Sequence, residues 1–166
     1  MKRFVHTIDQ ISEWSGKIFS FFLISVMLII GFNIFMRIFG APQIWVFDIT
    51  LFQAGAVYVV GGAYTHLKNR HVRMDVLFDR LSPRTQALLD LITLPGFIVF
   101  VGILLWIGAI RGWESFLMNE KLVTGFRPIV WPVRLMIPVG GFLLLLQGLA
   151  KAIRDFHMVV KGERLD

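Results

Sequence analysis

The sequence contains no cysteine, so its 166 residues can form neither a disulfide framework nor a thiolate metal site. Charge is also scarce, because Asp, Glu, Lys and Arg make up 17% of the chain while hydrophobic residues make up 56%. A soluble domain of this size has too little interior for so much apolar surface. Together with a mean hydropathy of +0.70, this composition predicts an integral membrane protein.

Charge is absent from four stretches, which are residues 18–36, 49–67, 91–110 and 135–150. A helix needs about 20 predominantly apolar residues to cross a bilayer. The fourth stretch is short, so it must use its flanks, with Trp131 as an interfacial anchor. We therefore expect an all-α integral membrane fold: one membrane domain, residues 1–166, with four transmembrane helices at approximately 16–37, 47–67, 86–111 and 131–153.

Positive charge is distributed unequally between the segments that connect these stretches. The two tails and the second loop hold twelve of the seventeen Lys and Arg residues, and the opposite side holds five. Because Lys and Arg accumulate on the cytoplasmic side, both ends of the chain are expected in the cytoplasm. The same bias explains the net charge of +6 without nucleic-acid binding. The first stretch exceeds a signal-peptide core in length, which predicts an uncleaved signal anchor.

Two segments outside the stretches have amphipathic patterns. The N-terminal tail places Phe4, Ile8, Ile11 and Trp14 at helical spacing among charged residues. This pattern predicts either a short interfacial helix on the inner membrane surface or a helical extension that packs against a partner. Residues 72–81 show a looser version of the pattern, and Ser82 and Pro83 then supply an N-cap and a first helical residue.

No ionisable residue occurs inside the four stretches, which argues against a proton relay or an ion path within the chain. Asp48 and Asp90 lie at stretch ends, where water and headgroups are expected to solvate them. The deeper polar residues are expected to form interhelical hydrogen bonds; they are Ser25, Asn33, Thr50, Gln53, Tyr58, Tyr64 and Gln147. The four histidines fall in connecting segments or at a helix edge, which disfavours haem. We expect no catalytic residue, metal or cofactor in this chain.

Small residues recur in the second stretch. Gly55 and Gly62 are seven residues apart, about two helical turns, so they lie on one face of a helix. Small residues let helix backbones approach closely. They predict tight packing, either within the chain or against a partner.

Three segments resemble the DctQ-like small membrane subunits of TRAP (tripartite ATP-independent periplasmic) transporters. The first runs from Gly61 through a basic loop into His71-Val-Arg-Met-Asp75. The second is Gln43-Ile-Trp-Val-Phe-Asp48, although Phe47 stands where the family often has another acid. The third is the run from Trp131 through Pro138 into the following glycines and leucines.

The resemblance implies a non-catalytic subunit of an ion-coupled transporter for an organic acid in the bacterial inner membrane. The expected partners are membrane lipids, a periplasmic substrate-binding protein and a large polytopic subunit that carries the sodium sites and the translocation path. The small subunit would pack against that large subunit and stabilise it. The alternatives are a membrane anchor for a respiratory or other enzyme and a stand-alone small transporter.

The residues that we expect at a partner or lipid interface fall into three groups. Trp45, Asp48, Trp113 and Trp131 are placed on the periplasmic side, where a binding protein would dock. His71, Arg73 and Asp75 are placed in the cytoplasm, where they would order the second loop. The third group is the glycine pair of the second stretch.

Overall fold

The computed structural model describes residues 2–67 and 81–161. The described residues contain four long α-helices, which are α1 (Lys2–Ile38), α2 (Trp45–Leu67), α4 (Pro83–Leu117) and α5 (Trp131–Lys161). Each is long and apolar enough to cross a membrane. The prediction of an all-α protein with four such helices is confirmed.

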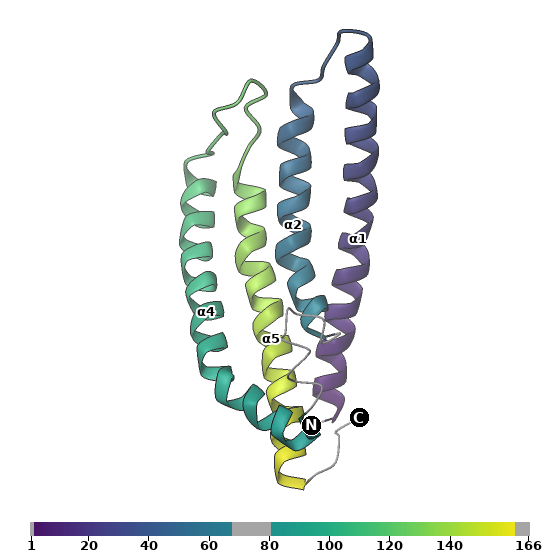
Figure 1. Ribbon diagram of the computed structural model, residues 1–166. Helices are drawn as coiled ribbons and strands as arrows, with labels where there is room; N and C mark the ends of the chain where they lie inside the picture. The colour runs from purple at the N-terminus through teal and green to yellow at the C-terminus, as the bar shows by residue number, and fades with distance from the viewer. Residues whose placement is uncertain (1, 68–80, 162–166) are drawn as a thin grey trace.

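The helices form an open row and do not close into a bundle (Figure 1). Their spatial order is α1, α2, α5, α4, because α2 packs between α1 and α5, and α5 packs between α2 and α4. The last helix in the chain therefore lies inside the row. The start of α1 and the end of α5 lie at one end of it, here called the terminus end, and the turns 39–44 and 118–130 lie at the other, called the loop end.

The first helix is longer than the predicted first span. We expected the amphipathic tail to form either a short helix on the membrane surface or a helical extension that packs against a partner. The structure shows the helical extension, because α1 runs unbroken from Lys2 to Ile38. Its Ile8 is buried against Ala150 of α5, whereas Ile11 and Trp14 are exposed. The second amphipathic segment, residues 72–81, lies almost wholly outside the described residues.

The start of α4 follows the predicted signals. The Ser82 hydroxyl accepts a hydrogen bond from the Thr85 backbone N–H at 3.3 Å, and Pro83 is the first helical residue. Serine satisfies an otherwise unpaired amide there, and proline has no amide to leave unpaired. Further along, Pro95 removes one backbone hydrogen bond, and α4 bends in this first third of its length (Figure 1).

Close contacts between helices depend on glycine. A Cβ on Gly108 of α4 would lie 2.8 Å from Ile137, and one on Gly112 would lie 2.9 Å from Leu135. On α5, a Cβ on Gly140 would lie 2.6 Å from the Val59 carbonyl oxygen. The two interfaces of α5 therefore need residues without side chains, as small-residue packing in membranes predicts.

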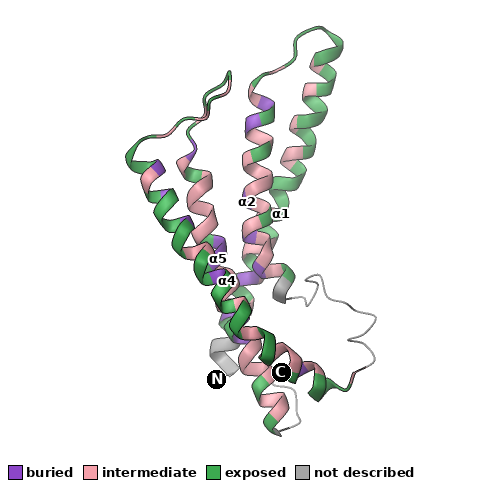
Figure 2. Ribbon diagram, turned by 60° about the vertical axis from the view of Figure 1, so that its left-hand side comes forward, coloured by how far each residue is buried: buried purple, intermediate pink, exposed green. Residues whose placement is uncertain are grey.

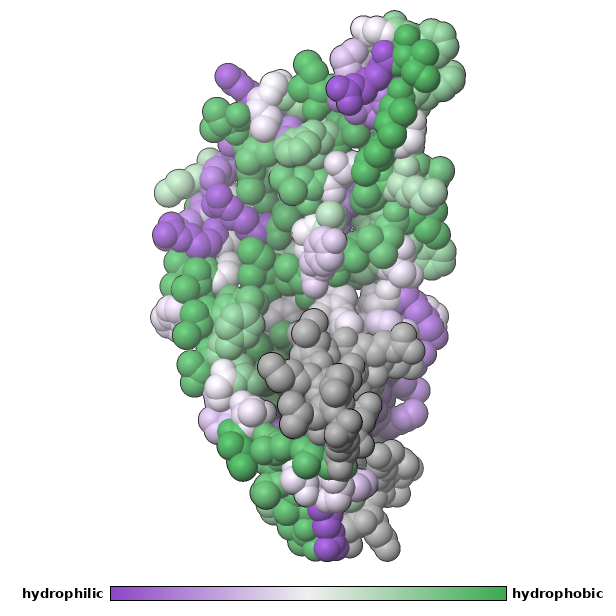
Figure 3. All heavy atoms as spheres, viewed as in Figure 1, coloured by the Kyte–Doolittle hydropathy of each residue, from purple (hydrophilic) through white to green (hydrophobic). Residues whose placement is uncertain are grey.

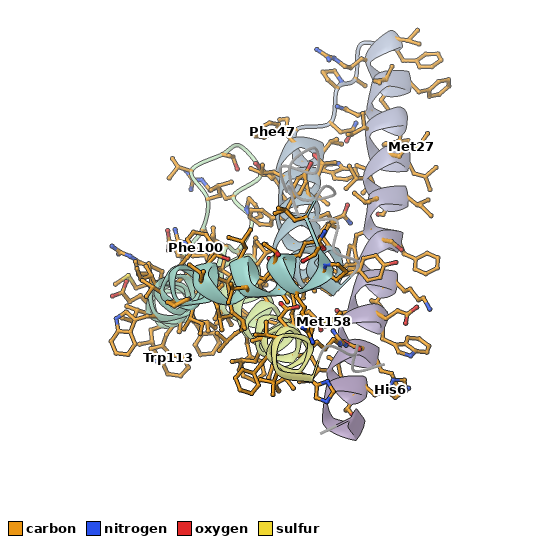
Figure 4. The ribbon with its side chains drawn as sticks, turned by 60° about the horizontal axis from the view of Figure 1, so that its bottom comes forward. His6, Met27, Phe47, Phe100, Trp113 and Met158 are labelled. Carbon is orange, nitrogen blue, oxygen red and sulfur yellow. The ribbon has the colours of Figure 1, made fainter. Side chains whose placement is uncertain are left out.

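The exposed surface of the row is largely apolar. Figure 2 shows exposed residues along α1 and α4, whereas buried and half-buried residues concentrate on α2 and α5. Hydrophobic side chains cover most of the described surface in Figure 3. Met27 on α1 points away from the neighbouring helices (Figure 4). Lipid or another apolar membrane surface must therefore cover both edges of the row.

Candidate functional site

Four polar residues join α1 to α5 at the terminus end. The amide of Gln147 donates to the Asp9 carboxylate at 3.1 Å and accepts from the Ser12 hydroxyl at 3.0 Å. Arg154, two turns further along α5, forms an ion pair with the same carboxylate. Ser12 and Gln147 are fully buried, so these hydrogen bonds replace water for both residues. The sequence predicted an interhelical role for Gln147, and the structure shows its partners.

A second ion pair joins α5 to α4 nearby. The Lys151 ammonium lies 2.5 Å from the Asp90 carboxylate and 3.7 Å from that of Asp155. All three side chains are less than one fifth exposed. The expectation that Asp90 is solvated by water and headgroups is therefore wrong, because a lysine on the neighbouring helix neutralises it. Asp90, at the end of the third stretch, thus joins α4 to α5.

The 118–130 hairpin at the loop end begins with a helix-terminating turn. Asn119 has a φ of 45°, its amide donates to the Phe116 carbonyl, and the Glu120 amide donates to the Ser115 carbonyl. This arrangement is a Schellman motif with asparagine in the left-handed position. An antiparallel bridge between Lys121 and Ile129 then pairs the two arms of the hairpin.

Two side-chain contacts fix the hairpin to helices. Glu120 receives a two-pronged ion pair from Arg134 of α5, with one N–H···O distance of 2.8 Å. At the tip, the Thr124 hydroxyl donates to the Asp48 carboxylate of α2 at 2.6 Å. A Cβ on Gly125 would lie 3.0 Å from Ile44, so the tip also approaches the start of α2 closely. The hairpin thus connects α4 and α5 to α2.

Aromatic side chains gather beside the base of the hairpin. The rings of Trp113 and Phe116 stack at 5.6 Å, and Phe116 meets Trp131 edge to face at 5.2 Å. Trp113 is exposed and points outward from α4 (Figure 4). Such a cluster is typical of the headgroup level of a membrane.

The predicted residues of the loop end lie in different environments. Trp45 is partly buried, and its indole N–H donates to the Gln43 side chain at 3.2 Å. Asp48 is only 1% exposed, so the expectation that it is solvated by water and headgroups is wrong. Its second carboxylate oxygen has no hydrogen-bond partner among the described residues. The Asp48 carboxylate is therefore buried in the protein and joined to the hairpin through Thr124.

The two glycines of α2 that were predicted to lie at an interface, Gly55 and Gly62, have different surroundings in the structure. A Cβ on Gly55 would lie 4.0 Å from Val133 of α5, which is ordinary contact, whereas a Cβ on Gly62 would meet nothing within 4 Å. Ala56, Val60 and Ala63 form the buried face instead. The predicted cytoplasmic group, His71, Arg73 and Asp75, lies outside the described residues, so its role stays a prediction.

Sequence reasoning missed the partners of these residues. Thr124, Glu120 and Arg134 were not expected to fix a hairpin, and Asp9 and Arg154 were not expected to pair. Asp9 and Arg154 are separated by 145 positions in the sequence. The available signal was opposite charge on the two tails that flank the first and last stretches. In the two described parts of the chain, no three His, Cys, Asp or Glu side chains are grouped to hold a metal ion.

A comparison with known families shows to which family this four-helix protein belongs. A family model described as the DctQ component of the tripartite ATP-independent periplasmic transporters matches residues 26–158. The chain belongs to this family. The match takes in all of α2 and α4, the second part of α1 and most of α5. A comparison with curated proteins finds no match.

Membership in the DctQ family decides between the alternatives left open by the sequence. The chain is the small membrane component of a TRAP transporter, a multi-pass membrane protein and not an enzyme. An anchor for a respiratory enzyme and a stand-alone transporter are thereby set aside. A DctQ component acts within a tripartite system, so its surfaces matter more than any internal site.

Proposed function

We propose that this DctQ component packs against the large translocating subunit in a bacterial inner membrane and stabilises it there. The transporter would take up an organic acid by ion-coupled transport, with the sodium sites on the large subunit. A periplasmic binding protein would deliver the substrate.

The observation that supports this proposal is the openness of the helix row. The four charge-free stretches hold no Asp, Glu, Lys or Arg, and the helices pack in sequence along the row, α1 on α2, α2 on α5 and α5 on α4. Large apolar side chains such as Phe21, Met27 and Phe100 are exposed along it. A component with so much lateral apolar surface and no site of its own is suited to cover another membrane protein.

The test is recovery of partners from native membranes. Tagged full-length chain would be purified in mild detergent, and co-purifying proteins identified by mass spectrometry. We expect a much larger polytopic protein, together with a periplasmic binding protein when substrate is present. Recovery of a soluble redox enzyme in place of these would contradict the proposal.

The proposed orientation puts the terminus end in the cytoplasm. It rests on the excess of Lys and Arg in the tails and the second loop. Because the chain has no cysteine, single cysteines can be introduced without background. We expect Val123→Cys at the loop end, but not Val160→Cys at the terminus end, to react with a membrane-impermeant maleimide in intact cells. The reverse pattern would invert the topology.

We also propose that the 118–130 hairpin contributes to docking of the binding protein. Val123 at its tip is 100% exposed and Phe126 is about half exposed, while Thr124 and Glu120 fix the backbone beside them. A preorganised loop binds at a lower entropic cost than a free one. Val123→Glu should reduce recovery of the binding protein while recovery of the large subunit is unchanged. Equal loss of both proteins would point to general damage, not docking.

A further inference from the structure

The contact between the loop-end hairpin and α2 combines two features that each cost free energy. We define the hairpin tip as residues 123–127, which form a loop closed by a hydrogen bond of 3.0 Å from the Leu122 amide to the Pro128 carbonyl. From this tip the Thr124 hydroxyl donates to the Asp48 carboxylate of α2. One of the costly features belongs to Asp48 and the other to the tip itself.

The first feature is a buried carboxylate without a cation. Asp48 is 1% exposed, and in the described parts of the chain no Lys, Arg or His forms an ion pair with it. Its Oδ1 atom is buried and has no hydrogen-bond partner there. The side chains of Gln53 and Ser115 also bury an unpartnered atom, but they are neutral, and burying a charge without a counter-charge costs much more free energy. The start of α2 offsets part of this cost, since a helix N-terminus carries about half a positive charge.

The second feature is a strained backbone at Arg127. Its φ is 49°, in the left-handed region that residues with a Cβ rarely adopt. Residue 128 is proline, which pushes the residue before it towards an extended conformation and so adds to the strain. Asn119 also has a positive φ, but asparagine tolerates this region, and there it ends α4. The Arg127 side chain is exposed and forms no hydrogen bond or ion pair with the described residues, so it does not hold the backbone in this conformation.

The contact of the tip with α2 accounts for both costs. Strained backbone persists only where surrounding contacts enforce it. Two contacts hold the tip against α2, namely the hydrogen bond from Thr124 to Asp48 and the close approach of Gly125 to Ile44. When the tip leaves α2, water can hydrate both oxygens of Asp48, and Arg127 can return to an extended backbone. A single movement thus relieves both costs.

We propose that the hairpin tip is a latch that is poised to open. In the closed state, which the structure shows, Thr124 binds Asp48. In the open state the tip leaves α2, the Asp48 carboxylate meets water, and the Arg127 backbone is extended. The base of the hairpin stays in place in both states, because the ion pair between Glu120 and Arg134 fixes it. The inference concerns this chain alone and does not depend on the proposed function.

The test measures the distance between the hairpin tip and the end of α1. The chain has no cysteine, so nitroxide labels can be attached to Val123→Cys and Ile38→Cys alone, and both positions are exposed. Pulsed electron spin resonance on the purified full-length chain in lipid nanodiscs then gives the distribution of distances between the labels. We expect two distances, of which the longer belongs to the open state, and Thr124→Val should increase the share of the longer one.

Two substitutions are expected to close the latch. Asp48→Asn keeps the shape of the side chain and an oxygen that accepts from Thr124, but it removes the buried charge, so the ratio of open to closed chains should fall about tenfold. Arg127→Gly removes the strain, because glycine adopts a positive φ freely, and the ratio should fall about fivefold. Arg127→Ala is the matched control, since it keeps the Cβ and the strain, and it should change the ratio by no more than about twofold. Neither substitution should disturb the helices, because Asp48→Asn is nearly isosteric and Arg127 is exposed.

The direction of the Asp48→Asn effect separates the latch from a purely stabilising contact. A hydrogen bond to a charged oxygen is stronger than one to a neutral oxygen, so a purely stabilising contact would open more often in Asp48→Asn. An open share that rises or stays the same in this variant would overturn the proposal. Equal effects of Arg127→Gly and Arg127→Ala would do the same, because the left-handed residue would then belong to the hairpin turn in both states. A single distance that remains single in Thr124→Val would show that the tip does not open.

Discussion

The two ends of the helix row hold their buried carboxylates in different ways. At the terminus end, Asp9 and Asp90 each have a cationic partner on α5, so charge is neutralised between helices. At the loop end, Asp48 is buried but meets only the Thr124 hydroxyl, and one of its oxygens has no partner in the described parts of the chain.

This difference separates a structural role from a functional one. Ion pairs between three helices are costly to break once their charges are shielded from water. A single hydroxyl contact at a hairpin tip is weaker and easier to adjust. At the terminus end, paired charges therefore join the helices, whereas at the loop end one hydroxyl contact joins the hairpin tip to α2.

The largest effect is expected from Lys151→Met. Removing the ammonium takes away the cation that lies 2.5 Å from the Asp90 carboxylate and 3.7 Å from that of Asp155, and both side chains are less than one fifth exposed, so the change should cost about 3 kcal/mol of unfolding free energy. Thermal unfolding in detergent would measure the loss. Lys17→Met is the matched control, because its pair with Glu13 is exposed and should change stability by no more than about 0.5 kcal/mol. Equal unfolding temperatures for the two variants would remove the contrast between the ends.

A smaller effect is expected from Asp9→Asn. Arg154 would lose its carboxylate while Gln147 keeps a polar neighbour, so the cost should be about 2 kcal/mol and confined to the contact of α1 with α5. Hydrogen exchange should accelerate in residues 6–17 and remain unchanged in α4. The double variant Asp9→Asn with Arg154→Gln should cost less than the sum of the single changes. Strict additivity would show that the pair is not coupled.

The smallest effect is expected from Thr124→Val, which removes the hydroxyl donated to Asp48. We expect a global cost of about 1 kcal/mol and faster hydrogen exchange in residues 118–130, because the hairpin tip loses its contact with α2. Thr124→Ser should behave like the unmodified chain. A global loss as large as that of Lys151→Met would mean that the loop end also fixes the fold.

The helix number could be predicted from the sequence because a single physical requirement governs it. Backbone groups in hydrocarbon must bond within their own helix, so long charge-free stretches become spans. The start of α4 could also be predicted from Ser82 and Pro83, because capping depends on a few adjacent residues.

The helix order and the polar contacts could not be predicted in this way. Asp9 and Arg154 meet only because the C-terminal part of α5 reaches the N-terminal part of α1 at the terminus end, and no local pattern encodes that placement. The amphipathic tail left two alternatives open because the same apolar spacing suits a membrane surface, a partner or another helix, and the contact of Ile8 with α5 became visible only in the structure. Tyr58 was expected to bond within the protein, and its exposure became visible only once the neighbours of α2 were placed.

The position of α5 inside the row has a consequence for biosynthesis. Helices enter the membrane in chain order, and α1 and α2 can pair as soon as both are inserted. In the described structure α4 packs on α5 and not substantially on α1 or α2. Until α5 is inserted, α4 therefore lies in the bilayer without the helix on which it packs. Helix α5 must then insert between α2 and α4. Only α5 supplies Lys151 and Arg154, which pair with the carboxylates of Asp90 and Asp9. Assembly of the row is thereby delayed until α5 has been translated, and chains cut short before α5 would lack the contacts that unite the two halves.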